Sequence, residues 1–147
     1  MDLVPYLKGK GFLKTRLNFH RRVGDSVQVI NIQKSSWNSA ESGSFYVNVG
    51  LAFDTVWKIR NHPIQEKPPE FKCHARWRIN QLVPIDPKFW EVNQRTDLHA
   101  VSARLRDDVD KLLPDLDRID SVATLQVHPW FKEPGMIVKE LKSHAVS

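Results

Sequence analysis

The sequence predicts an α+β fold, in which an antiparallel sheet of four to five strands carries helices packed on one face. Three observations support this prediction. Apolar and polar residues alternate through much of residues 12–34, 45–53 and 71–82, which is the period of β-strands. Apolar residues then step by three or four from Leu98 to Leu116, which is the period of a helix. No internal repeat is visible, so the helices are expected to cover the sheet rather than to alternate with strands.

The amino-terminal half is expected to supply most of the sheet. Leu3–Lys8 is a short helical turn at most, closed by glycines. A first strand over Phe12–Val23 and a second over Ser26–Lys34 form a hairpin that turns at Gly24 and Asp25. The third strand, Phe45–Phe53, follows a polar loop, and residues 54–57 either extend it or leave it.

The second half mixes one strand with helices. Three prolines make Asn61–Glu70 a surface loop, and Phe71–Leu82 is expected as the fourth strand. The long helical stripe should break near Leu113, because Pro114 cannot continue a helix. Ser121 is then expected to cap a short helix over Val122–Val127, and Met136–Ala145 is a last helix candidate.

Length and composition indicate one domain, residues 1–147, with an ordinary hydrophobic core. The 147 residues include 41% hydrophobic and 27% charged residues, and no apolar run approaches the ~20 residues of a membrane span. The first residues lack the basic and apolar regions of a secretory signal, so we expect a cytoplasmic, bacterial-type protein with no membrane partner. Cys73 is the single cysteine, which excludes an internal disulfide and favours a buried free thiol.

The net charge of +5 is concentrated at the amino terminus, which makes this a basic protein with an asymmetric charge. Residues 1–37 hold seven Lys or Arg and two Asp, whereas the remainder holds fifteen of each sign. Such asymmetry indicates an anionic partner, or else a solvated basic hairpin whose charges discourage edge-to-edge pairing.

Amides and a glycine interrupt the apolar strands, and these interruptions point to a candidate site. With the apolar sides turned inward, the opposite side of the predicted sheet would display polar residues from all four strands: Lys14, Arg16, Asn18, His20, Asn31, Gln33, Tyr46, Asn48, Gly50, His74, Arg76 and Arg78. Amides offer donors and acceptors, arginines offer rigid forks of donors, and Gly50 would let a ligand approach the backbone. We therefore predict an electropositive binding groove, the alternative being a ladder of cross-strand hydrogen bonds with nothing bound.

Several of these segments resemble the bacterial domain of unknown function 4304 family. The similarity lies in Gly11-Phe12, in residues 19–22, in residues 29–35, in Val47-Asn48-Val49-Gly50 and in residues 76–79, and it spans about residues 6–120. It extends to Trp90 before the long helix and to the proline-containing segment 113–116. The resemblance implies the fold and the selected positions, and it implies no reaction. The family's first helix is usually longer than residues 1–10 allow, and loop 61–70 has no recognisable counterpart.

Catalytic signatures are missing from the sequence. It contains no nucleophile elbow, zinc-protease motif, phosphate-binding glycine loop or dinucleotide fingerprint. Cys73 and His74 are neighbours on a predicted strand and would point to opposite faces, so they cannot form a catalytic pair. His20 and His74 could meet across the sheet, but hydrogen-bonded histidines are favoured over a metal site. We therefore expect a protein that is not an enzyme and that binds no cofactor and no metal.

Two function classes remain. The first is a non-catalytic binding module, for example an immunity-type domain that binds a protein partner through Arg16, Asn31, Gln33, Asn48, Gly50, Arg76 and Arg78, with Trp37 as an anchor. The alternative is a binder of an anionic ligand, either nucleic acid or a phosphorylated metabolite, through Lys14, Arg16, Arg76 and Arg78. Nucleic acid is the less favoured ligand, because Tyr46 is the one stacking candidate on the predicted face. An enzyme without a recognisable motif is a distant third.

Overall fold

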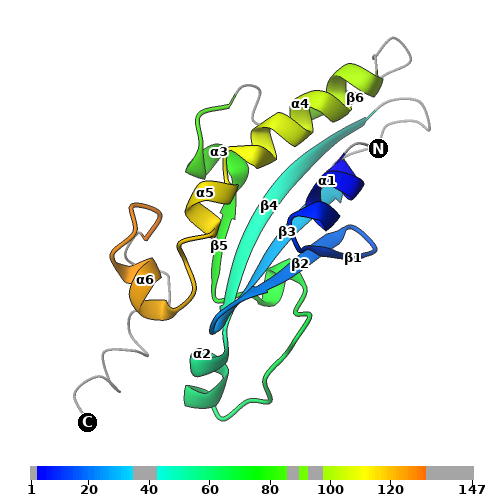
Figure 1. The fold of residues 1–147 in the computed structure, drawn as a ribbon. Coiled ribbons are helices and arrows are strands. Elements are labelled where there is room, and N and C mark those ends of the chain that lie inside the picture. The colour runs from blue at the N-terminus through cyan, green and yellow to red at the C-terminus, as the bar shows by residue number, and fades with distance from the viewer. Residues whose placement is uncertain (1–2, 35–42, 86–89, 93–97, 132–147) are drawn as a thin grey trace.

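The α+β fold is confirmed by the computed structural model, which describes residues 3–34, 43–85, 90–92 and 98–131. The described strands form one antiparallel sheet in chain order (Figure 1): β1 Leu13–Thr15, β2 Asn18–Val23, β3 Ser26–Lys34, β4 Gly43–Phe53 and β5 Ala75–Arg78. A sixth short strand, β6 Trp90–Val92, pairs with the first residues of β4. The five strands from β1 to β5 match the expected sheet, and β6 adds a short strand beside β4.

Most of the helices pack on one side of this sheet, which we call the helical face. They are α1 Leu3–Gly9, α4 Leu98–Asp110, α5 Leu113–Leu116 and α6 Val122–Gln126. The predicted break at Pro114 separates α4 from α5, and Ser121 caps α6 by accepting a hydrogen bond from the Thr124 amide. None of the helices in the described ranges combines the length and hydropathy of a membrane span.

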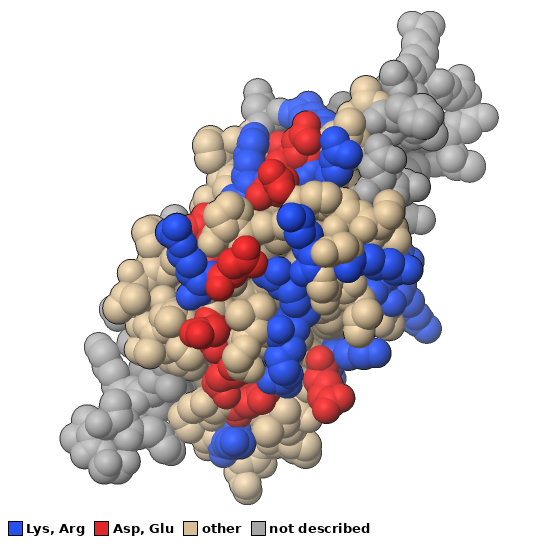
Figure 2. Space-filling model, viewed as in Figure 1, with Lys and Arg blue, Asp and Glu red and all other residues tan. Residues whose placement is uncertain are grey.

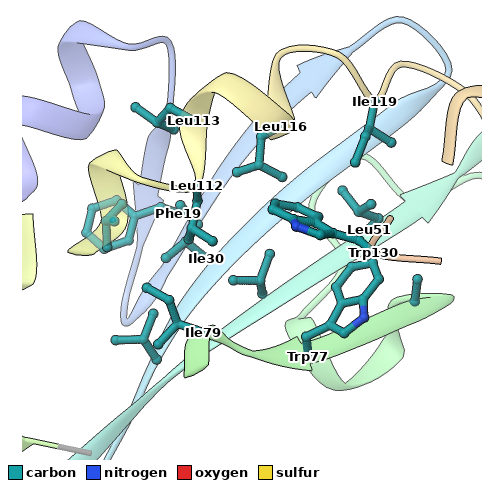
Figure 3. Packing of buried hydrophobic residues seen from close by; sticks show 14 of the residues in the cluster. Phe19, Ile30, Leu51, Trp77, Ile79, Leu112, Leu113, Leu116, Ile119 and Trp130 are labelled. Atoms are coloured by element: carbon teal, nitrogen blue, oxygen red, sulfur yellow. The ribbon is translucent and has the colours of Figure 1, made fainter. Parts of the chain in front are cut away.

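The hydrophobic core lies between the helical face and these helices. Strand residues Phe19, Ile30 and Leu51 are buried against Leu112 and Leu116, and Figure 3 shows these side chains converging from both layers. The rings of Trp77 and Trp130 lie 5.7 Å apart and close the core at its α6 end. Burial of this much apolar surface, at about 25 cal/mol per Å², is the main force that holds the helices on the sheet.

The predicted first strand, Phe12–Val23, is wrong as a single element. The chain reverses at Arg16 and Leu17, where Arg16 adopts a left-handed conformation with φ of 56°, and this turn separates β1 from β2. The reversal also exchanges the faces on which alternate residues lie. Lys14 pairs with Phe19 across the hairpin, whereas Leu13, which the predicted alternation places on the apolar inner side, is 60% exposed.

Around the end of β4 the structure decides one open alternative and corrects one expectation. Residues 54–57 do not extend the strand, because α2 Asp54–Ile59 begins there. The segment 71–82 contains a short helix η1 Glu70–Lys72, then β5, then α3 Ile79–Leu82, rather than one long strand. The expected loop with Trp37 and the expected helix over Met136–Ala145 lie outside the described residues.

A buried amide joins the sheet to the turn after α5. The Nε2 atom of Gln28, which is fully buried on β3, donates to the carbonyl oxygens of Leu116 and Ile119. Its Oε1 atom accepts two hydrogen bonds from Arg21, whose guanidinium also pairs with Asp117 at 2.9 Å. The Leu116 carbonyl also accepts from the Ile119 amide and the Ile119 carbonyl from the Ser26 hydroxyl, so Gln28 adds a second donor to each of these carbonyls at the end of α5.

The amino-terminal helix is attached to α4 by a second polar contact. The Tyr6 hydroxyl donates to the Asp110 carboxylate, and partial burial together with this carboxylate raises the pKa of Tyr6 to about 12.

Replacing Gln28 by leucine is expected to lower the free energy of unfolding by about 1–3 kcal/mol, because the carbonyls of Leu116 and Ile119 and the Arg21 guanidinium each lose hydrogen bonds in a buried setting. Denaturant melts of Gln28→Leu measure the loss. Gln126→Leu, at an exposed position of α6, is the matched control and should change the stability much less. Equal effects of the two substitutions would contradict the role given to Gln28.

Candidate functional site

One row of polar residues crosses five strands on the side of the sheet opposite the helices, which we call the opposite face. Backbone register aligns Thr15 with Asn18, Asn18 with Asn31, Asn31 with Asn48, and Asn48 with Arg78. Directly paired residues of antiparallel strands point to the same side of the sheet, so these five side chains share one face. The predicted gathering of Asn31, Asn48 and Arg78 on one surface therefore holds.

The amides of this row are joined into a chain of hydrogen bonds. The Nδ2 atom of Asn48 donates to Asn31 Oδ1 at 3.0 Å and to Gln33 Oε1 at 2.8 Å. Asn31 in turn donates from Nδ2 to Asn18 Oδ1 at 2.9 Å. We call Asn18, Asn31, Gln33 and Asn48 the amide ladder. Asn48 is buried at its centre, Asn18 and Asn31 are half-buried, and Gln33 is exposed, so the ladder is both a structural network and an accessible surface.

A stacked pair borders the ladder on the β5 side. The guanidinium carbon of Arg78 lies 3.7 Å from the ring centroid of Tyr46, whose neighbour across the strands is Gln33. A guanidinium held on an aromatic face loses conformational freedom but keeps its outward-pointing donors. Arg78 and Tyr46 are both half-buried, so the pair forms a rigid edge of the exposed polar surface.

The next row of the same face is closed over the three middle strands, where His20, Val29 and Gly50 are buried. Its members, in register across the strands, are Leu13, His20, Val29, Gly50 and Arg76. Residues 54–74, which we call the cover, leave the end of β4 and return across this row before β5 begins (Figure 1). Trp57 and Cys73 of the cover form a small second core with Val27, Val29 and Ala52.

Gly50 was predicted to admit a ligand, and that prediction is wrong. A Cβ atom at this position would lie 2.7 Å from the Cys73 sulfur and 2.9 Å from the Cys73 Cβ atom. The missing side chain therefore makes room for the cover. The expectation that residues 61–70 form a surface loop is likewise only partly right, since Pro68 and Glu70 are buried against the sheet.

The predicted cluster of free arginines is also corrected. Arg76 donates from Nε to Glu70 Oε1 at 2.9 Å and from Nη2 to Glu70 Oε2 at 3.2 Å. Glu70 is buried, and its hydrogen bond to Arg76 is the first cause that raises the pKa of this arginine. Arg76 thus fastens the cover to β5. Glu70 was missed from the sequence because its partner lies six residues away, across a segment expected to be one strand.

Two other predicted residues, Arg16 and Lys14, do not join the row. Arg16 lies exposed in the hairpin turn, and Lys14 points to the side that carries Phe19. Trp37 lies outside the described residues. The basic residues proposed for an anion site are therefore distributed over two sides of the sheet and one turn.

Charges of opposite sign lie side by side on the molecule, as Figure 2 shows for the view of Figure 1. Arg22 pairs with Asp54 at 2.9 Å, and Arg21 pairs with Asp117. Part of the positive excess of residues 1–37 is thus balanced locally by acidic residues from later in the chain.

The thiol of Cys73 is largely shielded from solvent. Cys73 is buried under the cover, and desolvation raises the pKa of its thiol well above the ordinary range. The His74 Nδ1 atom accepts a hydrogen bond from the Phe53 amide at 2.9 Å, while the Cys73 sulfur lies 3.8 Å from the Pro69 carbonyl oxygen. The two residues therefore do not act as a thiol and its base.

His20 and His74 on the opposite face each contact the cover. His20 contacts the Pro68 carbonyl oxygen through Nε2 at 2.9 Å, whereas His74 packs edge-on against Trp57 with ring centroids 4.4 Å apart. In the part of the chain that the structure describes, no three His, Cys, Asp or Glu side chains meet in an arrangement that could hold a metal.

Comparison with known families identifies the chain. The family model described as "Domain of unknown function (DUF4304)" matches residues 3–133, so the chain belongs to this family, as its motifs indicated. No curated protein and no solved structure matches the chain.

Gly50→Ala is expected to lower the free energy of unfolding by about 1–3 kcal/mol, because the added methyl group overpacks the contact with Cys73. Thermal and denaturant melts measure the loss. Gly9→Ala is the control, since a Cβ atom there meets nothing within 4 Å and should leave stability unchanged or higher. In a Cys73→Gly background the cost of Gly50→Ala should shrink, and an undiminished cost would show that Cys73 is not the obstacle.

Acidification is expected to weaken the cover through His20. Burial, with a smaller contribution from Lys67, lowers the pKa of His20, so the unfolded chain binds the proton more readily than the native chain. This contribution to stability is complete above the ordinary histidine pKa of about 6.5 and decreases as the pH falls below it. The free energy of unfolding measured from pH 8 to pH 5, at intervals of about one unit, should fall more steeply in the parent than in His20→Gln. Parallel profiles would contradict this assignment.

Proposed function

We propose that the protein is a non-catalytic binding module of the bacterial cytoplasm that docks a protein partner, in the manner of an immunity-type domain. The proposed binding surface is the part of the opposite face that the cover leaves accessible, namely the amide ladder with Tyr46 and Arg78. The observation that supports it best is the ladder itself, which fixes several amide groups in a row without burying all of them.

The residue types and their rigidity suit a protein interface. Tyr and Arg are enriched among the residues that dominate binding energy at such interfaces. Side chains already held by one another lose little conformational entropy on binding, so more of the contact energy remains as affinity. Two arrangements meet this condition: Arg78 is stacked on Tyr46, and Asn31 is hydrogen-bonded to both Asn18 and Asn48.

An anionic polymer has less support. Arg76 is paired with Glu70, Lys14 and Arg16 lie away from the row, and the ring of Tyr46 is covered by Arg78. Binding of single-stranded nucleic acid requires a basic track together with aromatic faces on which bases stack. The opposite face, within the described residues, offers Arg78 and Tyr46 already stacked on each other.

The proposal is tested by photo-crosslinking in cells that naturally produce the protein. A photoreactive amino acid at the position of Gln33, on the proposed surface, should give a discrete adduct that protease digests and nuclease does not. The same amino acid at the position of Gln126, exposed on α6, is the matched control and should give no such adduct.

Tyr46→Ala should abolish the adduct at position 33 while the protein remains folded. Equal adducts at positions 33 and 126 would contradict the proposed surface. An adduct sensitive to nuclease would instead favour the anionic alternative.

A further inference from the structure

Arg78 differs from the other arginines of the sheet in what it contacts. Arg21, Arg22 and Arg76 each donate to a carboxylate of this chain. Arg78 instead lies on the ring of Tyr46, and its Nη1 atom is shielded from solvent without a hydrogen-bond partner. Because Nη1 is itself closed to solvent while Arg78 as a whole is only half-buried, an incoming acceptor would use the remaining guanidinium donors, on Nε and Nη2.

The surroundings of Arg78 define what kind of acceptor would fit. Asn48 lies beside it in register, and Gln33 lies across from Tyr46. The side-chain oxygen Oε1 of Gln33 accepts a hydrogen bond from Asn48. Because this oxygen faces the ladder, the NH2 group of Gln33 is turned away from the ladder. An incoming group would therefore meet a guanidinium fork and an exposed amide donor, a combination that suits a planar group with two oxygens.

We infer that Arg78, stacked on Tyr46, is the anchor for a carboxylate of the partner, carried by an acidic side chain of a polypeptide. This inference rests on the proposed function and names the chemistry of the partner. One guanidinium balances one carboxylate charge, whereas a phosphate dianion would require a second cation. The ion pair would be bidentate, and Lys could not replace Arg without loss of the fork geometry.

The experiment uses nuclear magnetic resonance, which detects millimolar affinities. The Nε–Hε signal of Arg78 and the side-chain amide signals of Gln33 and Asn48 are followed while acetyl-triglutamate amide is added to the full chain. We expect saturable shifts of these signals. Acetyl-triglutamine amide, which has the same shape without the charge, should bind about tenfold more weakly or not at all.

Two variants separate a specific anchor from general attraction. Arg78→Lys keeps the charge and should weaken triglutamate binding about tenfold. Lys14→Gln removes one charge from an exposed position on the other side of the sheet and should leave binding unchanged within about twofold. Equal weakening by the two substitutions, in variants whose backbone spectra show the native fold, would overturn the inference.

Inorganic phosphate is the last ligand to be titrated. Tighter binding of phosphate than of triglutamate at the Arg78 signal would overturn the carboxylate assignment, as would the absence of any shift with triglutamate. A failure here alongside a protease-sensitive adduct at position 33 would remove only the carboxylate anchor. A nuclease-sensitive adduct at position 33 would remove the proposed function itself.

Discussion

The close approach of Cys73 to Gly50 determines which part of the opposite face is accessible. A sheet covered by helices on one side normally leaves its other side to solvent, yet here the chain leaves β4, forms α2 and returns over the second row of the opposite face. That return needs a position without a side chain beneath it, and Gly50 is that position. The Glu70–Arg76 ion pair and the His20–Pro68 contact then fasten the cover at points on β5 and β2. The row of amides beside it stays accessible because the cover occupies the neighbouring row.

Amide side chains have different roles on the two faces of β3. Gln28 on the helical face is fully buried, and all of its described partners are groups that the fold must satisfy: two carbonyls and an arginine. Asn31 and Gln33, a few residues along, bind mainly other amides, and they remain half-buried or exposed. Removing Gln28 would take hydrogen bonds from buried groups that water cannot reach, whereas the residues of the amide ladder could exchange part of their bonding with a ligand at little cost. For this reason we assign a binding role to the amide ladder and a stabilising role to Gln28.

The sequence predicted the fold class, the β2–β3 turn, the break at Pro114 and the cap at Ser121, because each depends on local periodicity or local backbone chemistry. It failed at Arg16, since a left-handed arginine is uncommon and nothing in the residues around it signals a turn. That one reversal exchanged the two sides of β1, which removed Lys14 from the predicted groove. It also failed at Gly50, because a glycine in a strand indicates a close approach without saying whether a ligand or the chain itself approaches. The amides of β3 and β4 were placed correctly, since both strands keep an unbroken period of two.

The rigidity of the amide ladder follows from its position between two well-packed regions. Beneath it, Val47 and Val49 of β4 and Ile30 and Ile32 of β3 are buried in the main core, so the strands that carry the ladder cannot shift relative to each other without disturbing that core. Beside it, the cover holds the same strands through the second core. A partner that docks on the ladder would therefore meet groups already in place, and the energy of ordering them has been supplied by folding. This division explains how a small sheet can present a defined polar surface. The core and the cover fix the backbone, and the fixed backbone holds the side chains of the row in a fixed pattern of donors and acceptors.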